Sequence, residues 1–165
     1  MRWLGKIDTI LFDLDDTLIV EYQSAEDTFV ETIKLLDFPI DTGDFLQTIR
    51  KQAREEWYKL PTIDYAKRIS ISSWEALWAD FTGDHEQLKK LRELAPGYRF
   101  RTWNKSLLKY SITDEKMAEK LSLEFKRIRD TKHILFSETR DVLITLKNRY
   151  KLGLITNGAP DLQWK

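Results

Sequence analysis

The chain has short, continuous apolar runs near its two ends and a long region of helically spaced apolar residues between them. Residues 7–12 are mostly apolar and end directly before Asp13, which predicts a buried β-strand. Residues 151–156 form a second such run, which predicts another strand ending at Thr156. The intervening residues 20–132 are predicted to be mostly helical, so the pattern indicates an α/β fold with a large helical insertion.

The helical region and the segment after it divide into predicted helices whose apolar residues recur three or four positions apart. These apolar positions are, in order, Phe29, Ile33 and Leu36; Phe45, Ile49, Ala53, Trp57 and Leu60; Trp74, Leu77, Trp78 and Phe81; Leu88, Leu91 and Leu94; Trp103, Leu107 and Tyr110; Met117, Leu121, Phe125 and Ile128; and Val142, Leu143 and Leu146. The predicted helix caps are Ser24 with Asp27, Ser72 or Ser73, and Ser137, and the predicted breaks are Pro39, Pro61, Gly83 and Pro96 with Gly97. A further helix is predicted to begin at residues 161–165.

Two aspartates, Asp13 and Asp15, follow the first strand at alternate positions, with Thr17 two residues further on. Side chains alternate along a strand, so both carboxylates are expected on one side of its carboxyl end, where open α/β sheets bind ligands. One carboxylate of such a pair can attack as a nucleophile while the other, kept protonated by its neighbour's charge, donates a proton to the leaving group. A divalent cation would offset their repulsion. The alternative for these residues is a polar turn or a helix cap after a strand.

Residues 10–18, ILFDLDDTL, resemble the first signature of the haloacid dehalogenase-like superfamily, a hydrophobic strand followed by Asp-x-Asp-x-Thr. Residues 152–158, LGLITNG, resemble its second signature. The helical block between them is similar to the α-helical cap that some members insert after the first signature. The resemblance implies a Rossmannoid parallel sheet, here with two signature strands, in a core of residues 1–19 and 133–165, and a cap of residues 20–132.

The resemblance also implies roles for individual residues. Asp13 would be the nucleophile that forms an aspartyl-phosphate, and Asp15 would be the general acid and base. Mg²⁺ would bind one oxygen of Asp13 and the backbone carbonyl of Asp15. Thr156 would hydrogen-bond the phosphate, with Asn157 and Gly158 shaping the loop around it. The expected activity is therefore that of a Mg²⁺-dependent phosphatase acting on small phosphorylated metabolites.

Other functions remain open at this point. A phosphotransferase or mutase, or a dehalogenase, of the same superfamily is an alternative, although halide leaves without a proton and an acid at Asp15 therefore favours phosphoryl chemistry. In the family, the third signature, a lysine, and the fourth, an acidic pair, follow the second. Here only nine residues follow Thr156, and Lys165 lies too close to Thr156 to be assumed the missing lysine. We therefore expect a C-terminally truncated chain that is inactive by itself. A non-catalytic fragment or interaction module is the alternative from another class.

Composition excludes several kinds of site and partner. The chain has 27 basic and 27 acidic residues, and this balance disfavours a nucleic-acid partner. It has no cysteine, which excludes disulfides and thiolate metal sites, and its two histidines, His85 and His133, lack the spacing of metal ligands. No run of about 18 apolar residues is present, so we expect a cytoplasmic protein that does not span a membrane.

Two surfaces remain as candidates for partners. Arg101, Lys105 and Lys109 recur every four residues and predict a basic stripe, interpreted as a solvated helix face. The alternatives are attraction of an anionic small substrate and contact with nucleic acid, the latter disfavoured by the balanced charge. The strand at residues 7–12 is expected to have an unpaired edge. Because uncovered apolar strand edges are pairing sites, self-association through this edge is expected.

Overall fold

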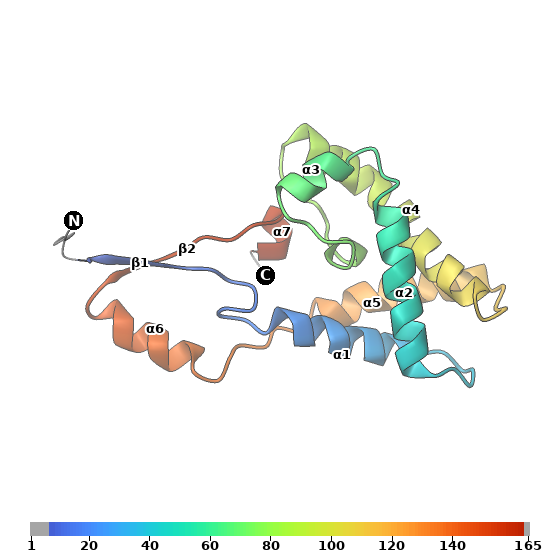
Figure 1. Cartoon of the computed structure of the whole chain (residues 1–165), viewed down its shortest axis with the longest axis horizontal. Helices are drawn as coiled ribbons and strands as arrows, with labels where there is room; N and C mark the ends of the chain where they lie inside the picture. Colours follow the sequence, from blue (N-terminus) through green and yellow to red (C-terminus); the bar gives the residue numbers. More distant parts are fainter. Residues whose placement is uncertain (1–6, 164–165) are drawn as a thin grey trace, which may run out of the picture. The chain divides into compact units, whose positions relative to one another are not determined.

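The computed structural model describes residues 7–163, which form two compact units (Figure 1). The sheet unit consists of the described residues up to Ser24 together with His133–Thr156. The helical unit consists of Ala25–Lys132 and the described residues from Asn157 onward. The helical unit thus overlaps the cap predicted at residues 20–132, and it also includes the segment after Thr156.

The sheet unit is built on two parallel strands, β1 (Thr9–Phe12) and β2 (Lys151–Leu154). Their register pairs the first residue of β1 with the first of β2 and the last with the last. Helix α6 (Thr139–Lys147) precedes β2 and packs against it. The prediction of an α/β fold is confirmed, although β1 begins two residues later than predicted and β2 ends at Leu154 rather than at Thr156.

The helical unit contains one short 3-10 helix and several α-helices, the first of which starts within the sheet unit. They are α1 (Glu21–Ile33), α2 (Thr42–Trp57), α3 (Ile63–Arg68), η1 (Glu75–Leu77), α4 (Glu86–Leu108), α5 (Glu115–Arg129) and α7 (Pro160–Gln163). Side chains cap three of them, since Asp41, His85 and Asp114 accept hydrogen bonds from backbone amides in the first turns of α2, α4 and α5. Within residues 7–163, no helix is both long and apolar enough to cross a membrane.

The sequence analysis predicted two helices separated at Pro96, but the structure has one helix, α4, in this region. It continues through Pro96 and Gly97 to Leu108. Its inward face, which includes Ala95 and Tyr98, is buried, and the helix packs against both α2 and α5. The tertiary packing of a long helix therefore outweighs the local penalty of an internal proline and glycine.

The segment after α3 is less helical than predicted. Ser72 and Glu75 form the reciprocal hydrogen bonds of a capping box, with Ser72 N to Glu75 Oε2 at 2.7 Å and Glu75 N to Ser72 Oγ at 3.2 Å, but the helix ends at Leu77. Arg99 of α4 donates hydrogen bonds to the backbone carbonyl of Ala76, within this short helix, and to that of Ala79, beyond it. These bonds replace the helical ones and leave residues 78–83 as an ordered loop.

Two further differences concern short segments. The cap predicted at Ser24 is wrong, because α1 begins at Glu21 and the Ser24 hydroxyl donates within the helix to Val20 O at 2.6 Å. Helix α3 was missed, because its six residues are too short for a helical period to show. The predicted helix at residues 161–165 is present as α7, and Trp164 and Lys165 lie outside the described residues.

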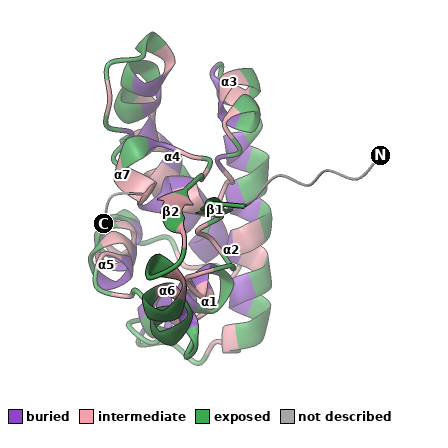
Figure 2. Ribbon diagram, turned by 90° about the vertical axis from the view of Figure 1, so that its left-hand side faces the viewer, coloured by how far each residue is buried: buried purple, intermediate pink, exposed green. Residues whose placement is uncertain are grey.

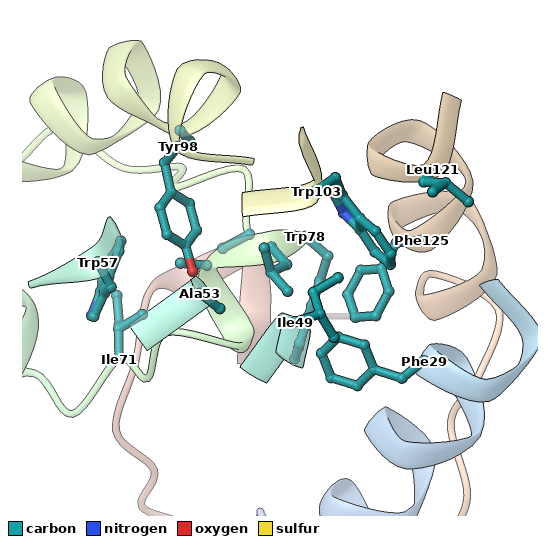
Figure 3. Packing of buried hydrophobic residues seen from close by; sticks show 14 of the residues in the cluster. Phe29, Ile49, Ala53, Trp57, Ile71, Trp78, Tyr98, Trp103, Leu121 and Phe125 are labelled. Atoms are coloured by element: carbon teal, nitrogen blue, oxygen red, sulfur yellow. The ribbon is translucent and has the colours of Figure 1, made fainter. Parts of the chain in front are cut away.

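The hydrophobic core belongs to the helical unit. Phe125 of α5 lies between Phe29 of α1, at a ring-centroid distance of 4.6 Å, and Trp103 of α4, at 5.8 Å (Figure 3). In the described chain, every buried hydrophobic residue lies in this unit. Figure 2 shows the same contrast, with buried residues along α2, α4 and α5, whereas β1 and β2 carry only intermediate and exposed residues.

Candidate active site

The strand register brings the two predicted motifs to one edge of the sheet. Asp13 directly follows Phe12, the last residue of β1, and Thr156 comes two residues after Leu154, the last residue of β2. The ladder continues one step beyond the strands, because Ile155 N donates to Phe12 O at 2.8 Å. Since parallel strands have their carboxyl ends at the same edge, Asp13 and Thr156 lie at the end of the sheet where α/β proteins bind ligands.

A tight turn holds the first motif. The carbonyl of Leu14 accepts hydrogen bonds from the amides of Thr17, Leu18 and Ile19 at 2.9–3.2 Å. The Thr17 hydroxyl donates to Asp13 Oδ2 at 3.3 Å. This geometry supports the interpretation that Thr17 orients the site. Because β1 already ends at Phe12, the turn, rather than strand alternation, places the residues after Asp13.

Asp16 has a structural role in this turn. Its backbone is in the left-handed region, with φ of 54°, which Asp tolerates better than most residues. Its Oδ1 accepts a hydrogen bond from Tyr22 N, in the first turn of α1, at 3.1 Å. The carboxylate therefore faces the start of a helix, as expected for a residue outside the chemistry.

Hydrogen bonds to the start of α6 and to the segment before it also hold this turn. Val20 N donates to Ile134 O at 2.7 Å, and the buried Thr139 donates its hydroxyl to Leu18 O at 2.9 Å. Beside this segment the sheet unit has an apolar hollow of about 630 Å³, lined by strand and α6 residues such as Phe12 and Leu143. Neither predicted catalytic aspartate lines the hollow, so it is separate from the candidate site.

The loop after Thr156 is closed by a side chain that the sequence analysis did not identify. Gln163 Nε2 donates to Asn157 O at 2.7 Å. Gly158 has φ of 121°, and a Cβ placed there would lie 2.9 Å from Gln163 Nε2, so glycine suits both the backbone and the close approach. Thr156 belongs to the sheet unit, whereas Asn157 begins the segment that groups with the helical unit.

The donor atoms at this edge suit magnesium. Asp13 and Asp15 offer carboxylate and backbone carbonyl oxygens, the ligands that this hard cation prefers. Across residues 7–163 no group of three or more His, Cys, Asp or Glu side chains could hold a metal. Magnesium does not require such a cage, because it commonly binds one or two carboxylates and completes its shell with water and substrate phosphate.

Comparison with known proteins identifies the family. The model of haloacid dehalogenase-like hydrolases matches residues 7–165. The chain belongs to this family. It is 29% identical over 157 residues to the phosphoserine phosphatase of Thermus thermophilus. Its fold resembles that of the HAD-hydrolase YfnB from Bacillus subtilis, with a TM-score of 0.56 and 16% sequence identity. The YfnB structure is bound to magnesium and reveals interdomain movement.

The matched region is only part of each relative. The alignment with the phosphoserine phosphatase covers 93% of this chain and 59% of that protein. The structural match covers 97% of this chain and 57% of YfnB. This haloacid dehalogenase-like chain therefore spans about three fifths of the length of the relatives it matches.

Proposed function

We propose that the full-length protein containing this chain is a Mg²⁺-dependent phosphatase of small phosphorylated metabolites that forms an aspartyl-phosphate on Asp13. The observation that carries the proposal is the register that brings Asp13 and Thr156 to the same edge of the sheet. Membership of a hydrolase family, the similarity to a phosphoserine phosphatase and the magnesium in the YfnB structure support it.

In the proposed mechanism, residues of this chain carry out the nucleophilic attack and the proton transfers of both steps. In the first, an Asp13 carboxylate oxygen attacks phosphorus, the bond from phosphorus to the substrate oxygen breaks, and Asp15 gives that oxygen its proton. In the second, Asp15 takes a proton from water, which attacks phosphorus and releases Asp13 and orthophosphate. Thr156 donates its hydroxyl to a phosphate oxygen, and Thr17 orients Asp13. Magnesium, held by Asp13 and Asp15, would supply charge neutralisation at the phosphate.

The test compares three neighbouring aspartates in the full-length protein. Asp13→Asn should abolish hydrolysis of p-nitrophenyl phosphate, and Asp15→Asn should reduce kcat by about 10² to 10⁴-fold, the usual scale of acid–base catalysis. Asp16→Asn is the matched control, because its amide oxygen can still accept from Tyr22 N, and it should retain activity within a few-fold. Phosphoserine is the first natural substrate to assay, given the similarity to a phosphoserine phosphatase.

Two further measurements separate this mechanism from other phosphatase chemistry. Mass spectrometry after acid quenching should find a phosphoryl group on the peptide that contains Asp13, and chelation with EDTA should remove turnover until Mg²⁺ is restored. Full activity in Asp13→Asn would refute the assignment of the nucleophile.

A further inference from the structure

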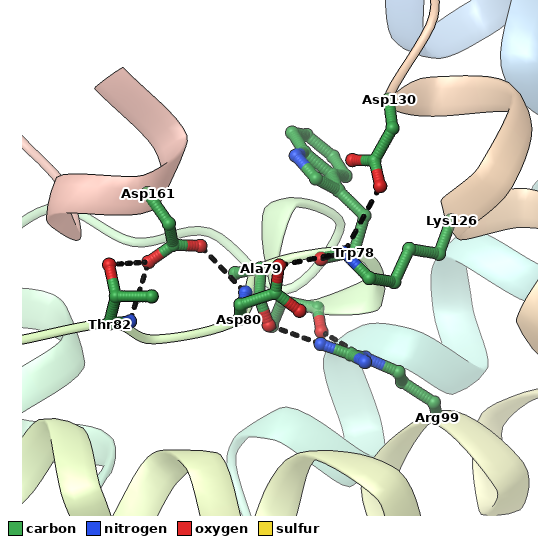
Figure 4. Close-up of polar contacts among 9 residues, drawn as sticks. Trp78, Ala79, Asp80, Thr82, Arg99, Lys126, Asp130 and Asp161 are labelled. Atoms are coloured by element: carbon green, nitrogen blue, oxygen red, sulfur yellow. Dashed lines mark hydrogen bonds and ion pairs between the residues drawn. The ribbon is translucent and has the colours of Figure 1, made fainter. Parts of the chain in front are cut away.

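The segment that follows Thr156 is anchored to a distant loop by one carboxylate, that of Asp161. Asp161 Oδ2 accepts a hydrogen bond from Asp80 N at 2.6 Å, and Oδ1 accepts from Thr82 N at 2.8 Å and from Thr82 Oγ1 at 3.3 Å (Figure 4). Both oxygens are therefore engaged by partners about eighty positions away in sequence. Hydrogen bonds from backbone amides to a carboxylate are among the stronger ones in proteins.

The loop that contacts Asp161, residues 78–83, is also held by cations of two helices. Arg92 Nη2 of α4 donates to Phe81 O at 2.8 Å and to Gly83 O at 3.2 Å. Lys126 Nζ of α5 donates to Trp78 O at 3.1 Å and contacts Asp80 Oδ2 at 2.9 Å (Figure 4). Cations of α4 and α5 thus hold carbonyls of the 78–83 loop, while Asp161 holds two of its amides.

The anchored segment, residues 157–163, is held by contacts of its own with the helical unit. Ala159 is fully buried in the core of the helical unit, and Gln163 closes the turn onto Asn157 O. Pro160 lies against Gly83, since its Cγ is 3.6 Å from the position of a Cβ built on that glycine. These contacts make residues 157–163 part of the helical unit, in agreement with the division of the chain at Thr156.

One peptide bond therefore separates Thr156, the residue proposed to bind phosphate, from a segment that is fixed to the helical unit. The chain therefore connects the 78–83 loop, through Asp161 and residues 157–163, to Thr156. Any coupling along this connection would act in both directions, because a coupling between two sites is reciprocal.

We propose that Asp161 is a positioning residue that couples phosphate binding at Thr156 to ordering of the 78–83 loop. The proposal rests on the phosphate-binding role proposed for Thr156. Binding at Thr156 restrains residues 157–163, and their carboxylate anchor in turn restrains the amides of Asp80 and Thr82. Loss of the anchor leaves Asp13, Asp15 and Thr156 in place but removes the link.

Hydrogen–deuterium exchange in the full-length protein tests the anchor and the coupling separately. Without ligand, Asp161→Ala should speed exchange of the peptide containing residues 78–83 by at least about tenfold, since hydrogen bonds to a carboxylate are about twice as strong as those between neutral groups. Asp84→Ala, which removes an exposed carboxylate beside the same loop, is the matched control and should leave its exchange unchanged. If Asp161→Ala does not fold, Asp161→Asn, which keeps one acceptor oxygen, should show a smaller increase.

The coupling is tested by adding Mg²⁺ and orthovanadate, a mimic of the phosphoryl transition state. In the unmodified protein, exchange should slow both around Thr156 and in the 78–83 loop. In Asp161→Ala it should slow only around Thr156, and KM for p-nitrophenyl phosphate should rise about tenfold while kcat changes less than about threefold, as expected for lost binding rather than lost chemistry.

The possible outcomes separate the two proposals. An equal response of the 78–83 loop in the unmodified protein and in Asp161→Ala, or a collapse of kcat at constant KM, would overturn the coupling. A lack of protection around Thr156 in the unmodified protein would contradict the phosphate-binding role on which the coupling depends. Exchange of the 78–83 loop without ligand still decides whether Asp161 anchors it.

Discussion

Glu56 provides a sharp test of how the helical unit is held together. Its carboxylate, on α2, is only 3% exposed and contacts three cations: Lys59 Nζ and Lys105 Nζ at 2.7 Å, and Arg101 Nε at 3.0 Å. Burial raises the pKa of Glu56, but hydrogen bonds from Lys105, Lys59 and Arg101 outweigh it and lower the pKa from 4.5 to about 2. The ionised carboxylate therefore stabilises the folded state by joining α2 to α4.

The size of this contribution follows from the difference between the folded and unfolded pKa values. A shift from 4.5 to about 2 corresponds to an upper bound of about 3 kcal/mol at neutral pH. The side chains of Lys59, Arg101 and Lys105 are 61%, 44% and 42% exposed, so water screens the interaction. We therefore expect Glu56→Gln to lower the free energy of unfolding by about 1–2 kcal/mol at pH 7.

The pH dependence of stability shows whether the charge of Glu56 or the packing of its side chain stabilises the fold. Because the folded pKa is depressed, the contribution is complete above about pH 4.5 and is lost as pH falls toward 2. The difference between the unmodified chain and Glu56→Gln should therefore shrink by at least about half between pH 7 and pH 3. Urea unfolding followed by tryptophan fluorescence monitors the helical unit, since Trp57, Trp74, Trp78 and Trp103 lie in its described part.

Glu86→Gln is the matched control for this experiment. Glu86 pairs with Lys90 within α4, and both side chains are largely exposed, at 75% and 51%. Its replacement should therefore leave the urea midpoint unchanged at both pH values, because exposed ion pairs contribute little to stability. A loss in Glu56→Gln that is equal at pH 7 and pH 3 would show that packing of the side chain, rather than its charge, joins the helices.

Two further predictions concern the core and the sheet. Phe125 is fully buried, so Phe125→Ala should lower the free energy of unfolding by about 3–5 kcal/mol in urea titrations. The side chain of Leu123, on the same helix, is 71% exposed, so Leu123→Ala should lower it by less than about 0.5 kcal/mol. We also propose that two copies of this 165-residue chain pair through the sheet unit, where Leu11, Leu154 and Ile155 are 57%, 49% and 60% exposed. Light scattering should then give a mass above that of a monomer, and Leu11→Lys should reduce it, whereas a monodisperse monomer of the unmodified chain would contradict the pairing.

Periodicity predicted the long helices well because each buries one continuous face. The apolar positions predicted from Phe45 to Trp57 lie on α2, and those from Met117 to Ile128 lie on α5, whereas Leu60 follows the end of α2. The prediction of a helix break at Pro96 was wrong, because packing against α2 and α5 keeps α4 continuous despite the low helix propensity of proline and glycine. The helix prediction after Ser72 was also wrong, because the competing hydrogen bonds from Arg99 come from a helix distant in sequence, which a local pattern does not contain.

The candidate site was partly accessible from sequence for a similar reason. Asp13 and Thr156 directly follow apolar strands, so their position at the sheet edge depends only on local pattern and on parallel pairing. The role of Asp161 depends instead on the amides of Asp80 and Thr82, about eighty positions away, and a single aspartate near a helix start gives no signal for that. The basic stripe was interpreted as a solvated face, yet two of its members contact the buried carboxylate of Glu56.

The contact at Asp161 matters because the buried hydrophobic residues of the described chain lie in the helical unit and not in the sheet unit. In the described part of the sheet unit, the buried residues are Glu21, Ser24 and Thr139, none of them hydrophobic, so hydrogen bonds and strand pairing, rather than a core, hold the edge that carries Asp13. Such a unit opens more easily than one with a packed interior. Thr156, however, leads directly into Ala159, which is buried in the aromatic-rich core of the helical unit. The segment that begins at Asn157 therefore shares the stability of that core, and Asp161 is the side chain that fixes this segment to the 78–83 loop.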